Sequence, residues 1–384
     1  MNTVTDYNAT DPIKQEIYAL IQILRTGDDQ LSQAAAYSLA EFEQLAVPEL
    51  VQLLKKDTNS KVRARSAWAL GAIGIVSLSQ TLNPLLCALS DSDDQVRGQA
   101  AFALGRFGSA IAPQAIDPLI IALNDTSSEV RSWAANALGE IGPATFQAVA
   151  ALSVALFDPN ESVRVWSAIA LGQIGPKAAP HAIAPLIKVL TDQDVEVRNA
   201  ASYSLIHVGP LGISALIKTL SSGFDRKARW QASWILGQLI HIEPTLAPAV
   251  IEPLIEALND VDSTVRSVST RGLGFLGALA APLAIAPLIR ALTFDSVLSV
   301  RQGAAMALGQ IGPIAAPEAV DPLLQTLFNS AEPELRKEVA FALSLFGADA
   351  PPKVLEALIL HLNDRNALVR RAASDAVESI RATR

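Results

Sequence analysis

The chain is built from a segment that returns in altered form about every 34 residues, and Asp125–Gly142 is its clearest copy. One arginine in each copy serves as a ruler. A period of this length is typical of arrays in which each structural unit packs only on its neighbours. The 384 residues therefore indicate one array rather than two or three globular domains. The arginines are Arg63, Arg97, Arg131, Arg164, Arg198, Arg229, Arg266, Arg301, Arg336 and Arg370, and a weaker copy with Ser32 in this place opens the chain.

Each copy has the apolar spacing of an amphipathic helix, followed by a glycine. Val130, Ala134 and Leu138 fall on one face of such a helix. Gly142 then suits a left-handed helix end, which glycine adopts without a side-chain penalty. The equivalent glycines are Gly74, Gly108, Gly175, Gly209, Gly277, Gly312 and Gly347.

A second helix lies upstream of each copy and carries two prolines. In residues 179–190, Pro180 suits the first helical turn, whereas Pro185 removes an internal hydrogen bond and should bend the helix. The sequence thus predicts a pair of helices in each repeat, with the first helix bent. The same proline pair recurs as Pro113/Pro118, Pro248/Pro253, Pro282/Pro287 and Pro317/Pro322.

Eight repeats place an aspartate six residues before the arginine. An acid in the turn between the helices can cap the second helix, and it can accept a bidentate bond from an arginine, which we expect in the next unit. Because the pairs recur in so many repeats, they predict a structural ladder rather than a site of chemistry. The pairs are Asp57/Arg63, Asp91/Arg97, Asp125/Arg131, Asp158/Arg164, Asp192/Arg198, Asp260/Arg266, Asp295/Arg301 and Asp364/Arg370.

Together the helix pairs, the proline bends, the ladder and the Leu-Gly-x-Ile-Gly ending resemble the HEAT-repeat family. More narrowly, the chain is similar to the short HEAT-like repeats of phycobilisome (bilin) lyases. The resemblance covers about residues 11–381. It implies an all-α, right-handed α-solenoid of about eleven helix pairs, in which the second helix of each pair lines the concave surface. We expect a flexible tail at residues 1–10 and a single solenoid over residues 11–384.

The repeat at about residues 209–242 breaks the rhythm. Gly223 stands where the aspartate belongs, and Ile240 replaces the closing glycine. Arg226 and Lys227 gather beside Trp230 in the same repeat. One interpretation is a drifted repeat that kinks the solenoid. The other is a recognition site for an anionic group beside an aromatic surface, because local departures from the pattern are where function is expected.

Aromatic side chains gather on the exposed side of the second helices. Positions one, two, five and nine after the arginine lie opposite the apolar face, and all five tryptophans occupy such positions. Exposed aromatic side chains in a row predict a concave groove for a partner or ligand. Alternatively, rings of neighbouring helices pack on one another and make the array rigid. The predicted groove comprises Tyr37, Trp68, Phe102, Trp133, Trp166, Tyr203, His207, Arg226, Lys227, Trp230, Trp234 and Arg271.

Composition argues against several other classes. A net charge of −8 disfavours nucleic-acid binding. We find no secretory signal and no long apolar stretch without proline or charge, so we expect a cytoplasmic protein that does not insert into membranes. The single Cys87 excludes an internal disulfide framework. The four histidines, His181, His207, His241 and His361, form no metal-binding motif, so no catalytic residue and no metal are predicted.

Two functions from different classes follow. The first is a non-enzymatic scaffold that holds a partner protein in the concave aromatic groove. The second, implied by the narrower resemblance, is a bilin lyase or bilin chaperone that attaches or handles an open-chain tetrapyrrole on phycobiliproteins, with a role in phycobilisome disassembly as a variant. There the groove aromatics would stack on the pyrrole rings, and Arg226, Lys227, Arg229 or Arg271 would meet the propionates. The first function needs no cofactor, whereas the second needs a bilin.

Overall fold

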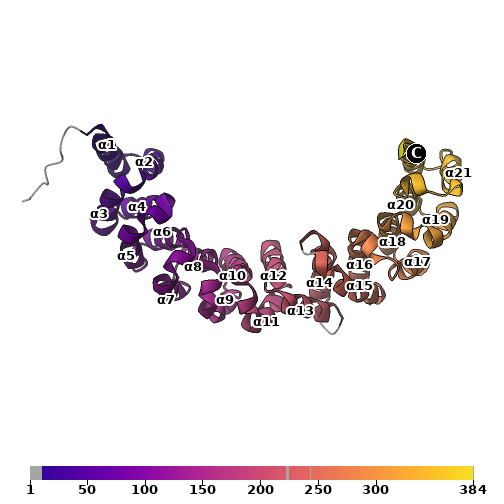
Figure 1. The fold of residues 1–384 in the computed structure, drawn as a ribbon, viewed down its shortest axis with the longest axis horizontal. Coiled ribbons are helices and arrows are strands. Elements are labelled where there is room, and N and C mark those ends of the chain that lie inside the picture. The colour runs from indigo at the N-terminus through magenta and orange to yellow at the C-terminus, as the bar shows by residue number, and fades with distance from the viewer. Residues whose placement is uncertain (1–10, 222–224, 243, 384) are drawn as a thin grey trace, which may run out of the picture. The chain divides into compact units, whose positions relative to one another are not determined.

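The computed structural model describes residues 11–221, 225–242 and 244–383, and within these ranges it is all α-helix and short 3₁₀ segments without a β-strand (Figure 1). The predicted all-α class and the helix pairs are confirmed. Contacts divide the chain into two compact units, residues 1–212 and 213–384. The division falls inside the predicted irregular stretch at 209–242. The single uninterrupted solenoid stays a prediction, and the predicted tail lies outside the described residues.

In unit 1, the even-numbered helices form an inner row and the odd-numbered helices an outer row (Figure 1). From α2 to α12, each inner helix packs on the next one in the row. The helices are α1 (Pro12–Thr26), α2 (Asp29–Glu41), α3 (Val47–Lys56), α4 (Ser60–Ile73), α5 (Leu78–Ala88), α6 (Asp94–Gly105), α7 (Ala112–Ala122), α8 (Ser128–Ile141), α9 (Val149–Ala155), α10 (Glu161–Ile174), α11 (Ala179–Val189) and α12 (Val195–His207).

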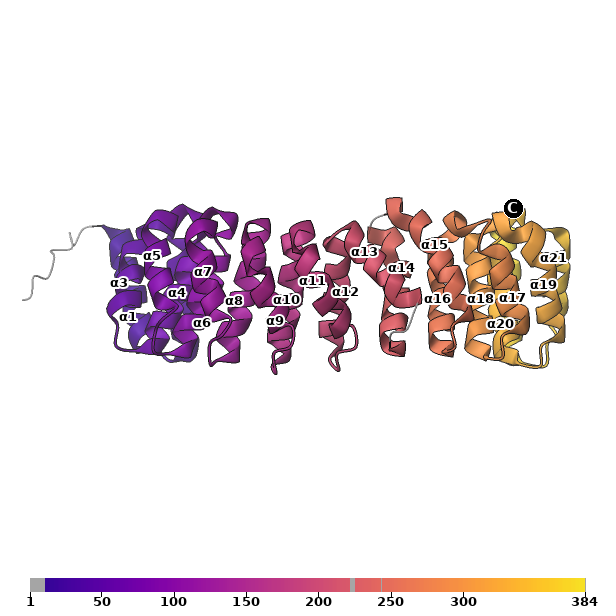
Figure 2. The ribbon, with the colours of Figure 1, turned by 90° about the horizontal axis from the view of Figure 1, so that it is seen from below.

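Unit 2 repeats the arrangement, and Figure 2 shows its helices standing side by side with turns at both edges. Its inner row is again even-numbered. The helices are α13 (Pro210–Ser221), which begins just before the division, α14 (Arg226–Ile242), α15 (Ala247–Glu256), α16 (Ser263–Phe275), α17 (Ile285–Phe294), α18 (Leu298–Ile311), α19 (Ala316–Asn329), α20 (Pro333–Ser344), α21 (Pro352–His361) and α22 (Ala367–Thr383).

A glycine inside most of the inner helices sets how closely the next inner helix approaches. A Cβ added at Gly105 would lie 2.9 Å from the Cα of Ala137, and one at Gly309 would lie 2.8 Å from the Cα of Ala342. Backbone this close leaves no room for a side chain, so the glycine of the Leu-Gly motif is required by helix packing. The equivalent contacts are Gly71/Ala103, Gly139/Ala170, Gly172/Ser204, Gly237/Gly272 and Gly274/Ala307.

The closing glycines adopt a positive φ, as predicted, but at Gly74, Gly142, Gly175 and Gly312 the conformation is not left-handed helical. Gly142 has φ 75° and ψ −141°. This region of φ/ψ space is open only to glycine. The chain then continues as a 3₁₀ segment, Gly142–Ala148, which leads into the next outer helix. The closing glycine therefore re-aims the chain rather than capping the helix in the expected way.

Prolines lie inside five outer helices, but one predicted pair is misplaced. Pro84, Pro118, Pro185, Pro253 and Pro322 are interior residues of α5, α7, α11, α15 and α19. The sequence predicted a helix containing Pro282 and Pro287, whereas α17 begins only at Ile285. Pro282 follows a cis peptide bond with Ala281, in a segment that precedes the helix.

Residues Ser60–Ala88 are long and apolar enough to be a candidate membrane span by length and composition. The stretch is not one helix, however. It consists of α4, a 3₁₀ segment (Gly74–Ser77) and α5, with Gly74 at φ 76° and ψ −155° between the two α-helices. Because these two α-helices belong to successive repeats, the stretch is part of the solenoid.

Candidate functional site

The ladder joins each repeat to the one that follows. Arg97 donates from Nε and Nη2 to the carboxylate of Asp125 at 2.7 and 2.8 Å, and from Nη1 to the carbonyl oxygen of Asp91 at 2.8 Å. One guanidinium therefore holds its own turn and the turn of the next repeat. The other pairs are Arg25/Asp57, Arg63/Asp91, Arg131/Asp158, Arg164/Asp192, Arg229/Asp260, Arg266/Asp295, Arg301/Glu332 and Arg336/Asp364.

Two details of the predicted ladder were wrong. Each aspartate accepts from the arginine of the preceding repeat, not of the next one. The aspartate also does not cap the second helix. Asp91 accepts the N–H of Asp93 at 2.9 Å, and Asp93 in turn caps α6 by accepting from Gln95. In this turn the first acid holds the backbone, while the second meets the free N–H groups of the helix.

The charges of the ladder are mostly shielded from water. The side chains of Arg97 and Asp125 are each 14% exposed. The hydrogen bonds that Arg97 donates hold the pKa of Asp125 below its ordinary value, although burial raises it, and the same bonds raise the pKa of Arg97. Such saturated pairs stabilise the repeat and leave no free group for catalysis.

Two ladder arginines bond only within their own turns in the part of the chain that is described. Arg198 donates to the carbonyl oxygens of Asp192 and Gln193. The position for its acid is Gly223, which lies outside the described residues. Arg370 donates to the carbonyl oxygens of Asp364 and Arg365.

In unit 1 the predicted groove residues form aromatic pairs between neighbouring inner helices. The rings of Tyr37 and Trp68 lie 4.3 Å apart, and those of Phe102 and Trp133 lie 4.9 Å apart, both edge to face. Tyr37 is nevertheless 52% exposed, so the pairs are packed on one side and open to solvent on the other. The geometry thus has features of both the packing alternative and a binding surface.

Farther along unit 1 the row becomes less regular. Trp166 of α10 is half buried, and Asn136 of α8 is buried. Tyr203 is exposed and stacks on His207 at 3.8 Å, while Nδ1 of His207 lies 2.7 Å from the carbonyl oxygen of Tyr203. His207, the only histidine of the predicted groove, is therefore held by a contact with the backbone of its own helix.

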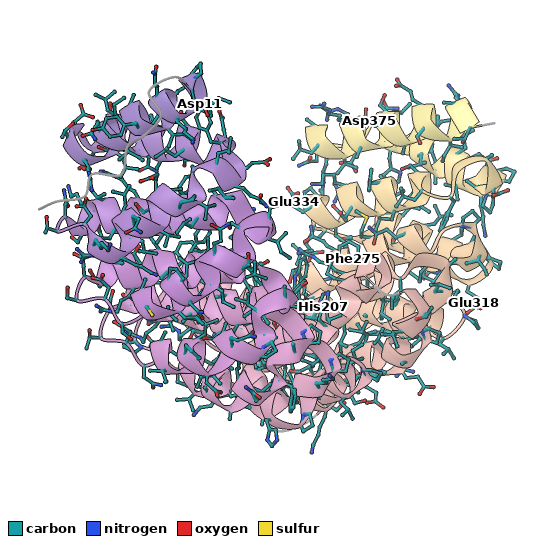
Figure 3. All side chains as sticks on the ribbon, turned by 60° about the vertical axis from the view of Figure 1, so that its left-hand side comes forward. Asp11, His207, Phe275, Glu318, Glu334 and Asp375 are labelled. Atoms are coloured by element: carbon teal, nitrogen blue, oxygen red, sulfur yellow. The ribbon has the colours of Figure 1, made fainter. Side chains whose placement is uncertain are left out.

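In unit 2 the rings of Trp230 and Trp234 are parallel, with centroids 6.2 Å apart, and Trp234 meets Phe275 of α16 edge to face. Phe275 lies on the inner side of the unit, whereas Glu318 of α19 lies on the opposite side (Figure 3). Sequence reasoning left Phe275 out of the groove. It occupies position nine after Arg266, a position already counted as exposed, so the signal was present.

Arg226 and Lys227 of the irregular repeat are exposed, whereas Arg229 is mostly buried in its pair with Asp260. Arg226 approaches Asp262, the N-cap of α16, at 3.6 Å. Arg271 is exposed beside Phe275. These side chains can meet an anionic group of a partner. The side chains of residues 239–242 and 244, among them that of His241, lie outside the described part of the chain.

Each unit has a hollow on its inner helices. The hollow of unit 1 has a volume of about 370 Å³ and that of unit 2 about 430 Å³. The first is lined by Asp29, Gln33, Ala36, Lys61, Ala64, Arg65, Trp68, Gln95, Gln99 and Glu129, and the second by Arg271, Phe275, Ser299, Gln302, Gly303, Met306, Gln310 and Glu338.

Several of these lining residues were missed for a simple reason. Lys61, Gln95 and Glu129 stand two residues before their arginines. At about 100° per residue, this position falls on the same face as positions five and nine. The positions that defined the predicted groove all follow the arginine. Among the described residues, no group of three or more His, Cys, Asp and Glu side chains could hold a metal ion.

Comparisons with known proteins support the repeat assignment. A family model described as HEAT repeats matches residues 17–104, 82–152, 116–206, 213–309 and 251–327. A second, described as a HEAT repeat associated with sister chromatid cohesion, matches residues 349–377. None of the curated proteins matches the chain.

Solved structures of karyopherins are similar in fold. Kap121p bound to the SUMO protease Ulp1p has a TM-score of 0.73 and 15% identity, over 96% of this chain and 45% of that one. A structure of Kap95p with RanGDP has a TM-score of 0.64 and 14% identity, over 97% of this chain and 57% of that one. The chain thus spans about half the length of these karyopherins. The narrower resemblance to bilin lyases finds no support in these comparisons.

Proposed function

Because the chain belongs to the HEAT-repeat family, we propose that it is a protein-binding scaffold that holds a partner protein against the aromatic surface of its inner helices. The observation that carries this proposal is the partly exposed rings on the inner helices of each unit, among them Tyr37 and Trp68 in unit 1 and Trp230 and Trp234 in unit 2. Solved relatives of the same fold hold proteins, since Kap121p is seen with Ulp1p and with Ste12p.

Physical chemistry favours a protein as the ligand of such a surface. A half-exposed indole offers a large apolar area at little cost in side-chain entropy, and aromatic residues are the commonest energetic centres of protein interfaces. The ladder and the glycine contacts hold successive inner helices in register. A surface that is ordered before binding loses less conformational entropy when the partner arrives.

The test removes aromatic side chains of the groove and compares these variants with a variant that removes an exposed aliphatic side chain elsewhere. In the full chain, Trp68→Ala and Trp234→Ala are expected to abolish co-purification of a partner identified by mass spectrometry with the wild-type protein. Ile121→Ala is the matched control, since Ile121 is 73% exposed on outer helix α7. Loss of helix content in the tryptophan variants would support the packing alternative, and unchanged partner binding would refute the proposal.

A further inference from the structure

Two cations of unit 1 share one carboxylate at the edge of the inner hollow. Lys61 Nζ donates to both oxygens of Asp29, at 3.0 and 3.1 Å, and Arg65 Nη2 donates to Oδ1 at 2.8 Å. The hydrogen bonds from Lys61 and then Arg65 lower the pKa of Asp29. The side chain of Arg65 is only 18% exposed, whereas that of Asp29 is 72% exposed. Arg65 is thus better fixed than the acid, whereas the side chain of Lys61 is 56% exposed.

The hollow beside this cluster combines three kinds of recognition group. Trp68 supplies an apolar wall, and Gln33, Gln95 and Gln99 supply amides. In the part of the chain that is described, no hydrogen bond is found for these three side-chain amides. Donors and acceptors of this kind suit the backbone of a bound segment. Glu129 lies at the far side, on α8, so the cations occupy one end of the hollow.

This cation pair stands out against the charge of its unit. Residues 1–212 contain 21 Asp and Glu but only 14 Lys and Arg, whereas residues 213–384 contain 17 and 16. The comparable hollow of unit 2 is lined by one cation, Arg271, and one acid, Glu338. The hollow of unit 1 thus places two cations beside one exposed carboxylate, with Glu129 as its second acid, in a unit where acids outnumber cations.

We propose that the hollow of unit 1 binds an acidic residue of a partner segment, with an adjacent apolar side chain on Trp68, and that the partner's carboxylate displaces Asp29 from Lys61 and Arg65. This inference rests on the proposed scaffold function and names the chemistry that its surface recognises. Asp29 occupies the position of the partner's carboxylate in the free protein.

Releasing Asp29 from the two cations costs the protein little free energy. An exposed ion pair contributes little to stability, and Asp29 returns to water when it leaves. The partner's carboxylate gains the charge-assisted hydrogen bonds that Asp29 gives up. The net gain comes from the neighbouring apolar side chain, which covers the indole of Trp68, and from the amides around it. Specificity therefore requires an acid and an apolar residue together.

The experiment measures binding of the full chain to a fluorescein-labelled random copolymer of glutamate and tyrosine by fluorescence anisotropy at pH 7. Asp29→Asn should tighten binding about threefold, because a competing carboxylate is removed. Arg65→Met should weaken binding of the copolymer about tenfold, and Lys61→Met should weaken it less. Asp321→Asn is the matched control, because it frees Lys353 from a similar exposed ion pair (2.6 Å) on outer helices without an aromatic hollow. It should change nothing.

Weaker or unchanged binding by Asp29→Asn would overturn the proposal. Unchanged binding by Lys61→Met would also overturn it, and this variant replaces Arg65→Met if the latter does not fold. Inorganic phosphate that competes as well as the copolymer would also overturn it, because the site would then take any small anion. If Trp68→Ala and Trp234→Ala lose the partner while Asp29→Asn and Arg65→Met bind the copolymer like the wild-type protein, the scaffold function stands and this inference fails.

Discussion

Removing one rung of the ladder should cost much more than a surface ion pair. Arg131 makes two bonds to the carboxylate of Asp158, at 2.7 and 2.8 Å, and one to the carbonyl oxygen of Asp125 at 2.8 Å. The Arg131 and Asp158 side chains are 14% and 10% exposed. Exposed pairs contribute up to about 1 kcal/mol, and breaking a fully buried pair costs about 3–5 kcal/mol. We therefore expect Arg131→Met to lower the free energy of unfolding by about 2–3 kcal/mol.

Urea denaturation followed by circular dichroism measures this loss, and a double-mutant cycle with Asp158→Asn separates the pair from other effects. Arg370→Met is the matched control, because Arg370 bonds only to the carbonyl oxygens of its own turn in the described structure and should cost under about 0.5 kcal/mol. A loss in Arg131→Met as small as in the control would refute the ladder's structural role. So would a selective loss of partner binding with unchanged stability.

Two further perturbations test the fold. The pKa of Asp125 and of Asp364 is held low in the folded protein by hydrogen bonds from Arg97 and Arg336, so their stabilisation is complete above the unfolded pKa of about 4. It should be lost as the pH falls through the lower folded pKa, and a urea midpoint that stays constant below pH 4 would contradict this. Gly105→Ala should destabilise by about 1–3 kcal/mol, because its Cβ would lie 2.9 Å from backbone. The Cβ of Gly98→Ala would meet only side-chain atoms, of Trp133 at 3.4 Å and Glu129 at 3.8 Å, and this variant should be neutral or stabilising in the same thermal melts.

Much of the fold could be predicted because the repeat shows the same signals many times. A single glycine or proline is weak evidence, but Gly142 and its equivalents mark the end of a helix at a constant period. The direction of the ladder could not be read in this way. Asp125 lies six residues before Arg131 and 28 residues after Arg97, and in a periodic chain both spacings recur equally. Only the packing of neighbouring turns decides between them.

The candidate site was harder to predict because it depends on several helices at once. The aromatic row was visible, since each ring has a fixed position on its own helix. The hollow of unit 1 instead needs Asp29 from α2, Lys61 from α4 and Gln95 from α6. Their proximity depends on how closely the inner helices stack, which small residues such as Gly71 determine. Sequence spacing within one repeat carries no information on that distance.

The same small residues account for where the chain divides. Eight residues after the arginine, the inner helices on both sides carry glycine, as in Gly172 and Gly237, but α12 carries Ile206. The acid position of the following repeat is Gly223, so the sequence also lacks the rung that would pair with Arg198. The residue type that permits close helix packing is thus lost in α12, and the acid that would tie successive turns is lost in the repeat that follows. Contacts divide the chain between Gly212 and Ile213, within that repeat. The irregular stretch therefore lacks residue types that join other repeats, while α13 and α14 keep the helix pair.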